Sequence, residues 1–410
     1  MELILLILSI ISIAVGFYMA WSIGANDVAN SMATAVGAKA ITFRQAALIA
    51  GVLIFFGAVF VGPHVVETVK GRIINYNAIN DLTILIIGFI SSLLAAALWV
   101  TIATWWEMPI STTHSVIGAL IGFGVVSAGL ESVNWREVGS VASSWVLSPV
   151  VGCILSFIVF KFIVYSVFAR DKPVESARII GPLLVGATAF IISASLLFKT
   201  YLGCMLSISD ADVFIVSIGV SIAVIIISFI LLNKTKSSSD DYTTIESIFR
   251  KIQIITSCYV AFSIGANDVA NAIGPVAAIT SLAGSRAFLT KADIPLYLLV
   301  IGGLGMCIGC LTWGSKVMRT VGERITSLTN TRGFSVDFGA ATTVLVASKM
   351  GLPISTSHTV VGAIIGVGLA RGLEAVDLKV IKKIIYSWLL TLPISAITSA
   401  IIFLGIMVFI

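Results

Sequence analysis

The sequence carries too little charge for a water-soluble protein of its size. Only 11% of its 410 residues are Asp, Glu, Lys or Arg, whereas soluble domains usually carry about 25%. Hydrophobic residues make up 58% of the chain. Because so few charges cannot cover a surface that faces water, most of the outside must face an apolar medium. The composition therefore predicts a membrane protein.

Residues and motifs that would build other kinds of protein are also scarce. Five cysteines are too few for a disulfide scaffold, and 35 glycines without a fixed period exclude a collagen-like chain. No group of His and Cys has the spacing of a zinc site, and there is no Walker motif. We interpret Cys307-x-x-Cys310 as packing residues in an apolar helix. We therefore expect no enzymatic activity, no cofactor, no nucleic-acid partner and no direct drive by ATP.

Apolar segments recur along the whole chain. A helix needs about 20 apolar residues to cross the hydrocarbon layer, and helices satisfy their own backbone hydrogen bonds there. We expect an all-α polytopic protein in the lipid bilayer of the cell (inner) membrane. The twelve candidate segments are 3–23, 45–63, 83–104, 109–128, 139–160, 179–198, 212–232, 252–266, 295–314, 335–348, 353–370 and 384–410.

The basic residues indicate how these segments are oriented. Lys and Arg are enriched in the short cytoplasmic loops of membrane proteins. If the N-terminus starts outside and every segment crosses, the inner loops hold 18 of the 25 basic residues. The run Leu3–Val15 has neither the basic start nor the cleavage site of a signal peptide. We therefore interpret it as the first span, with the N-terminus outside.

The sequence contains an internal repeat. The stretch Ser22-Ile-Gly-Ala-Asn-Asp-Val-Ala-Asn30 recurs without change as Ser263 to Asn271. The stretch Pro109-Ile-Ser-Thr-Thr-His114 recurs as Pro353-Ile-Ser-Thr-Ser-His358. A nine-residue identity is far beyond coincidence, so the chain is expected to hold two related halves.

The repeat divides the chain into four parts. Residues 1–168 form a first repeat of five segments, 169–232 hold two connecting helices, 233–251 are a polar cytoplasmic linker, and 252–410 form the second repeat. The second copy begins seven crossings after the first, and because seven is odd the copies have opposite orientation. Inverted repeats with interrupted or hairpin helices at the midplane are typical of secondary transporters, whose ligand site lies between the repeats.

The first motif places an acid in an apolar segment. A carboxylate without a partner costs at least ~3 kcal/mol there, so Asp27 must be protonated, hydrated or bound to a cation. On a helix, Asn26, Asp27 and Asn30 form one polar patch, and Gly24 either loosens the helix or lets another backbone approach. Carboxylate, amide and freed carbonyl oxygens suit Na⁺ better than a soft metal. A polar contact between helices is the simpler alternative for a single copy.

The second motif resembles the start of a helix that binds an anion. Proline favours the first position of a helix, and Ser111, Thr112 and Thr113 add hydroxyls beside unpaired N–H groups. The positive end of a helix dipole attracts anions such as phosphate. Ordinary N-capping by Ser or Thr is the alternative. His114 and His358 follow the motif, and we expect them to pack between helices rather than to bind the ligand.

Acids and anion sites in one place require a coupling ion. A bare carboxylate repels an oxyanion strongly at low dielectric, and a cation between them turns the repulsion into attraction. The anion should therefore bind well only together with its cations. The residues themselves thus predict symport of an oxyanion with Na⁺.

The paired motifs resemble those of the inorganic phosphate transporter (PiT) family over residues 20–165 and 255–400. The resemblance implies a carrier that imports inorganic phosphate with Na⁺ by alternating access. Some Na⁺-coupled relatives have an acid in the second segment, where this chain has Leu53-Ile-Phe-Phe56, and this difference bears on a third cation site. The resemblance implies phosphate contacts from Asn26, Asp27, Ser111, Thr112, Thr113, Asn267, Asp268, Ser355, Thr356 and Ser357, and Na⁺ contacts from Asp27, Asn30, Asp268 and Asn271.

Several alternatives stay open at this point. The carrier could be coupled to H⁺, with Asp27 or Asp268 as the proton acceptor, or could carry a metal–phosphate complex or sulfate. An intramembrane enzyme using Ser111 and His114, or an ion channel, would belong to another class of protein. The assembly we consider is a homodimer.

Overall fold

The chain folds into long helices. The computed structural model describes residues 2–69, 73–75, 79, 81–199, 209–233, 240–285, 294–349 and 354–409. In these ranges it contains twelve α-helices, one for each predicted segment. They are α1 (Glu2–Gly37), α2 (Phe43–Val69), α3 (Leu82–Trp105), α4 (Thr112–Ala128), α5 (Trp135–Ile163), α6 (Pro173–Lys199), α8 (Asp210–Asn233), α9 (Asp241–Ser285), α10 (Leu296–Arg319), α11 (Asn330–Lys349), α12 (Thr356–Leu369) and α13 (Leu378–Met407).

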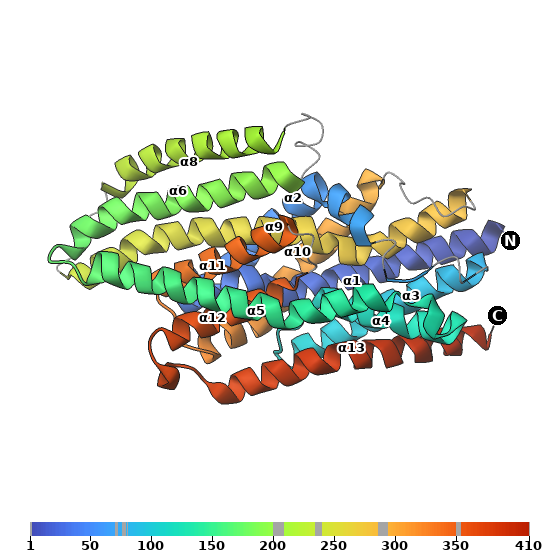
Figure 1. The fold of residues 1–410 in the computed structure, drawn as a ribbon. Coiled ribbons are helices and arrows are strands. Elements are labelled where there is room, and N and C mark those ends of the chain that lie inside the picture. The colour runs from blue at the N-terminus through green and yellow to red at the C-terminus, as the bar shows by residue number, and fades with distance from the viewer. Residues whose placement is uncertain are drawn as a thin grey trace.

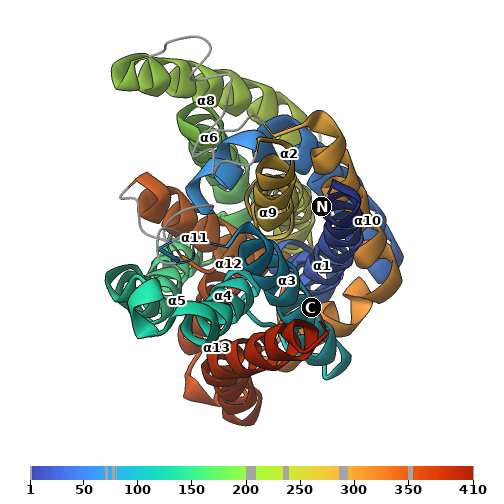
Figure 2. The same cartoon turned by 90° about the vertical axis from the view of Figure 1, so that its right-hand side faces the viewer.

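Most of these helices are built to lie in lipid. Eight of the described helices are long and apolar enough to cross a membrane. The outermost of them, α8, exposes large apolar side chains along its length, including Phe214, Ile215 and Ile226. Figure 2 shows α8 at the rim of the bundle and α1, α3, α9 and α12 near its centre. The all-helical membrane fold predicted from composition is confirmed.

The polar linker is shorter than predicted. Residues 241–251 belong to α9 rather than to a linker over 233–251. Asp240 precedes the helix and accepts hydrogen bonds from Thr243 N at 2.9 Å and Thr243 Oγ1 at 2.8 Å. The first turns of α9 then bury Ile245, Ile248, Phe249 and Ile252, which is the spacing of one helix face. This periodicity outweighed the polar composition that had suggested a linker.

The two repeats run in opposite directions. Figure 1 shows α1 starting at the end of the bundle that holds both chain termini, whereas α9 starts at the opposite end. The helices also pack symmetrically across the repeats, because α1 packs against α10 of the second repeat while α9 packs against α2 of the first. The inverted arrangement predicted from the sequence therefore organises the molecule.

Each repeat contains a helical hairpin that ends inside the bundle. In the first hairpin, α3 runs inward and α4 returns; Ile74 before α3 pairs with Val133 after α4 in an isolated β-bridge. In the second, Asp377 N, after α12, donates to Ile325 O, before α11, at 2.9 Å. The returning helices have 17 and 14 residues, or about 26 and 21 Å. Both are shorter than the hydrocarbon layer, so the first residues of both helices lie at depth. Pro353 of the second hydroxyl motif lies outside the described residues.

The hairpins are held by the opposite repeat. The second helix of the first hairpin, α4, packs against α13, and the corresponding helix of the second hairpin, α12, packs against α5. Each repeat therefore completes the other, and the interior between them contains residues of both.

The Gly-Ala-Asn-Asp motifs lie within continuous helices. Neither α1 nor α9 is interrupted at its motif, so no backbone carbonyl is released there, contrary to the first of the two roles considered for Gly24. Instead, a Cβ added at Gly24 would overlap the backbone of Met306 on α10. A Cβ at Gly265 would overlap the backbone of Ile54 on α2 in the same way. These glycines allow the close packing of the two helix pairs.

Gly24→Ala and Gly265→Ala should each lower the thermal stability of the purified protein. Overpacking a tight contact typically costs about 1–3 kcal/mol, because rigid backbone cannot yield to the new methyl group. Gly219→Ala in α8 is the matched control, since a Cβ there meets nothing within 4 Å. The unfolding midpoint in detergent measures the effect. Equal midpoints for all three variants would contradict the packing role.

Candidate functional site

The first acidic motif buries a carboxylate among neutral donors. Asp27 on α1 is 1% exposed. Its Oδ2 accepts a hydrogen bond from Thr112 Oγ1 at 2.9 Å. Its Oδ1 accepts from Asn30 Nδ2 at 2.8 Å and from Ser357 Oγ at 3.2 Å. These partners carry no positive charge, so they solvate the carboxylate without neutralising it.

Two helix starts lie beside this carboxylate. The first turns of α4 and α12 begin at Thr112 and Thr356. Ser111 and Ser355 cap them, since each side chain accepts from the backbone N–H three residues later, at 3.2 and 3.3 Å. Both predicted anion motifs therefore adopt capped helix starts, whose dipoles present positive ends to the same interior.

The site is shared between the repeats. Asn30 of the first repeat donates to Ser357 Oγ of the second at 2.8 Å. In the symmetric position, Asn271 of the second repeat donates to Thr113 Oγ1 of the first at 3.0 Å. Ser357 Oγ also lies 2.9 Å from the carbonyl oxygen of Ile110, at the tip of the other hairpin. The structure thus brings both acidic motifs and both hydroxyl motifs into one cluster.

Asn26 holds the tip of the first hairpin. Its Nδ2 donates to Thr104 Oγ1 at 2.9 Å and to the carbonyl oxygen of Met108 at 3.0 Å. Its Oδ1 accepts from the backbone N–H of Ile110 at 3.1 Å. This side chain therefore positions the loop that precedes α4.

The second half of the site is arranged differently. Asp268 is 5% exposed and lies in the interior like Asp27. Asn267, the counterpart of Asn26, is partly exposed and donates to Ser263 Oγ on its own helix at 3.3 Å. Thr356, the counterpart of Thr112, lines a pocket. The two half-sites are related by sequence but not identical in conformation.

The donor set fits a small hard cation beside an oxyanion. Asn30 Oδ1 is buried and, among the described residues, no hydrogen-bond donor reaches it. It lies in the same cluster as the Asp27 carboxylate and the hydroxyls of Thr112 and Ser357, which are all oxygen ligands. The described residues contain no group of three His, Cys, Asp or Glu that could hold a metal ion. Oxygen donors with one carboxylate suit a monovalent hard ion better than zinc or copper.

The comparison with known proteins identifies the family. A family model described as the phosphate transporter family matches residues 23–399. The chain belongs to this family. It is an integral multi-pass membrane protein, and its function is phosphate transport.

Similar proteins support this assignment. A relative from Thermococcus kodakarensis that carries the name phosphate permease is 50% identical over 97% of this chain and 98% of its own. The chloroplastic inorganic phosphate transporter 2-1 of Arabidopsis thaliana is 40% identical, over 97% of this chain and 72% of its own. A solved structure described as the sodium-dependent phosphate transporter is 46% identical, with a TM-score of 0.91, and covers 98% of this chain and 100% of that one.

The histidines of the two hydroxyl motifs, His114 and His358, pack against aromatic rings. Their ring centroids lie 4.9 Å apart. His114 contacts Trp145 at 4.8 Å, and His358 stacks on Trp388 at 3.8 Å. Both are buried, and they join the two hairpins behind the hydroxyl motifs. This agrees with the expectation that they pack between helices.

The transporter has a further buried carboxylate that the sequence patterns did not single out. Asp337 on α11 is 2% exposed. It accepts hydrogen bonds from Thr34 Oγ1 at 2.8 Å, Ser257 Oγ at 2.7 Å and Thr256 Oγ1 at 3.3 Å. An acidic residue inside the apolar segment 335–348 could have indicated this position as a functional candidate. In the repeat alignment its counterpart is Leu93, so no duplication drew attention to it.

Other predicted residues have ordinary structural roles. Glu107, which follows α3, forms an ion pair with Arg324 at 2.6 Å. Cys310 is buried and its thiol donates to Gly24 O at 3.3 Å, consistent with packing. Cys307 is a free thiol on the same helix.

Thr112→Val should weaken phosphate binding by tenfold or more. It removes the hydroxyl that donates to Asp27, and a hydrogen bond to a charged group contributes about 1.5–3 kcal/mol. Valine keeps the shape of the side chain. Titration calorimetry with inorganic phosphate in Na⁺ buffer measures the change. Thr343→Val is the control, because that buried threonine only donates to Gly339 O on its own helix; equal affinities for the two variants would contradict the assignment.

Proposed function

We propose that the protein imports inorganic phosphate together with Na⁺ by alternating access. The observation that supports this most is the shared cluster around Asp27, where one buried carboxylate contacts hydroxyls from both helix starts. A carboxylate and a phosphate oxyanion repel each other at low dielectric, so both can occupy this interior only with a cation between them. Phosphate contacts are assigned to Asn26, Asp27, Ser111, Thr112, Thr113, Asn267, Asp268, Ser355, Thr356 and Ser357, and Na⁺ contacts to Asp27, Asn30, Asp268 and Asn271.

Sodium is the favoured coupling ion for two reasons. The oxygen Oδ1 of Asn30 has no hydrogen-bond donor in the described part of the chain and lies beside Asp27, so it can coordinate a bound Na⁺. A proton bound to the Asp27 carboxylate would leave this oxygen without a partner. A solved structure that is 46% identical to this chain is described as a sodium-dependent phosphate transporter. Coupling to H⁺ or transport of a metal–phosphate complex are the alternatives that the experiment below separates.

Asp337 provides a candidate for an additional cation site. Its three hydroxyl partners and its carboxylate form an oxygen cage between α1, α9 and α11. Thr34 lies seven residues after Asp27 on α1, about 10 Å along the helix. A cation there would neutralise another buried charge close to the main site, so we assign Asp337 a role in the Na⁺ dependence of transport.

Asp27→Asn and Asp268→Asn should each abolish phosphate uptake driven by Na⁺. Asparagine keeps the size of the side chain but removes the charge that attracts the cation. Uptake of ³²P-phosphate into proteoliposomes with an imposed Na⁺ or H⁺ gradient measures the effect. Asp171→Asn, at an exposed position, is the control. Normal uptake by both site variants would remove the cation assignment.

The same vesicles separate the alternative functions. An H⁺ gradient that drives uptake without Na⁺ would favour proton coupling, and a requirement for a divalent cation would favour a metal–phosphate complex. Excess sulfate that abolished phosphate uptake would favour a sulfate carrier. Monoprotonated phosphate can donate a hydrogen bond to an aspartate, whereas sulfate cannot.

Asp337→Asn should lower the apparent Na⁺ affinity of uptake by about tenfold or more while leaving transport measurable at saturating Na⁺. The variant keeps the size of the side chain but loses the charge, and hydrogen bonds to charged groups contribute about 1.5–3 kcal/mol. The Na⁺ dependence of uptake at fixed phosphate measures it. An unchanged Na⁺ dependence would assign the carboxylate a purely structural role.

A further inference from the structure

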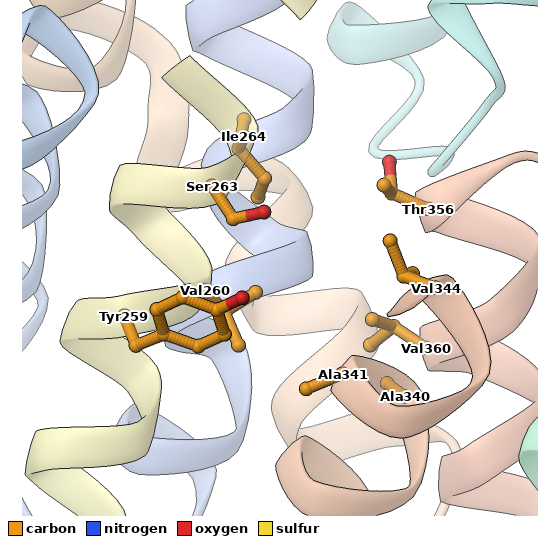
Figure 3. Close-up of a pocket in the computed structure, with 9 residues that line it drawn as sticks. All are labelled: Tyr259, Val260, Ser263, Ile264, Ala340, Ala341, Val344, Thr356 and Val360. Carbon is orange, nitrogen blue, oxygen red and sulfur yellow. The ribbon is translucent and has the colours of Figure 1, made fainter. Parts of the chain in front are cut away.

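A pocket lies beside the second half-site. It encloses about 390 Å³, including its open mouth, between α9, α11 and α12. Figure 3 shows the hydroxyl groups of Tyr259 and Ser263 directed from α9 toward the space opposite Thr356. The remaining lining residues are Val260, Ile264, Ala340, Ala341, Val344 and Val360.

The pocket reaches the proposed phosphate site. Thr356 begins α12 and directly precedes Ser357, which bonds Asp27 and Asn30. Ser263 accepts a hydrogen bond from Asn267 of the second acidic motif. The inner end of the pocket is therefore formed by residues that belong to the site or contact it.

The equivalent positions of the first repeat are closely packed. The repeat alignment relates the pocket residues on α9 to Tyr18, Met19, Ser22 and Ile23 on α1. Those on α11 and α12 correspond to Ala96, Ala97, Val100, Thr112 and Val116 on α3 and α4. Except for Tyr18, which is partly exposed, these counterparts are buried. We call this closed set the first gate and the pocket-lining set the second gate.

The two gates lie on opposite sides of the site. Each precedes its own acidic motif, the first gate on α1 and the second on α9. Because α1 and α9 run in opposite directions (Figure 1), residues that precede the two motifs extend toward opposite ends of the bundle. One gate is closed and the other is open in the same structure.

One hydrogen bond of the first gate has no counterpart by sequence in the second. In the first gate, Tyr18 Oη donates to Thr101 Oγ1 at 2.9 Å and joins α1 to α3. The second repeat keeps the tyrosine as Tyr259 but has Leu345 at the position of Thr101. A leucine side chain cannot accept a hydrogen bond. This particular tyrosine–threonine contact is therefore absent by sequence from the second gate.

We propose that the Tyr18–Thr101 hydrogen bond sets which of the two gates is closed at rest, the gates being the two entrances that alternating access opens in turn. This proposal rests on the transport function proposed above. The inverted repeats allow the two gates to exchange conformations. When the second gate becomes packed, the first gate can open to form an equivalent pocket. Ala97 and Ala341 are then equivalent positions in the two entrances, and Ala97 becomes accessible only when the second gate closes.

Cysteine labelling at these two alanines tests the proposal. A small charged methanethiosulfonate reagent is applied to Ala97→Cys and Ala341→Cys in detergent, and peptide mass spectrometry separates each site from the five native cysteines. Ala341→Cys should react faster, because its gate is open. Adding Thr101→Val removes the acceptor for Tyr18 and should raise the rate at Ala97→Cys about fivefold, the effect of one ordinary hydrogen bond.

A third substitution tests whether opening of the first gate depends on closing of the second. Val344→Trp fills the second gate and prevents it from closing, so it should cancel the increase at Ala97→Cys that Thr101→Val produces. Val346→Trp is the matched control, because Val346 lies two residues away on the same helix and is 51% exposed; it should leave the increase intact. Size-exclusion profiles confirm that each variant is folded.

Two results would overturn the proposal. One is an unchanged rate at Ala97→Cys in the Thr101→Val variant, and the other is an increase that persists with Val344→Trp, since this would show local loosening without alternation. The labelling needs no phosphate, so it is separable from the transport function. Wild-type proteoliposomes that fail to take up phosphate would refute that function, while the reciprocal labelling pattern would still support two alternating gates.

Discussion

The rest of the structure depends on a carboxylate that is buried in an apolar bundle without a basic partner. Asp27 can be kept there only if its oxygens are solvated by the protein or by a bound cation. Hydroxyls at two helix starts, together with Asn30, provide this solvation. Helix starts can reach the centre of a membrane protein only if the helices begin there, so the two hairpins follow from the same requirement. The dipoles that come with them make the interior suitable for an anion as well.

Duplication of one sequence unit provides both acidic motifs and both hairpins. Each repeat contributes an acidic motif and a hairpin, and the amides of Asn30 and Asn271 each contact a hydroxyl of the opposite repeat. Neither repeat can therefore form the site alone. The same interlocking joins α4 to α13 and α12 to α5, so movement of one hairpin must be accompanied by repacking in both halves. This coupling is the physical basis for treating the transporter as two exchanging states.

The sequence predicted the features that repeat and not those that occur once. The segments, the inverted order and the paired motifs could be read because apolar length and duplicated residues are strong signals. The start of α9 was missed because its polar composition hid the buried face from Ile245 to Ile252. Asp337 was missed because Leu93 occupies its place in the other repeat. The difference between Asn26 and Asn267 could not be predicted at all, since identical motifs carry no information about which half is closed.

Differences between the repeats are therefore where a preference between the two open states must be encoded. Perfectly equivalent halves would make the two open states equal in energy, and neither side would be preferred. A single acceptor, present as Thr101 and replaced by Leu345, changes that balance by the free energy of about one hydrogen bond, or roughly 1 kcal/mol. This bias is small enough for bound ions and phosphate to reverse, because ligands shift two states by their difference in affinity. A transporter needs a small free-energy difference between its two open states, since a strongly favoured state would stop its cycle.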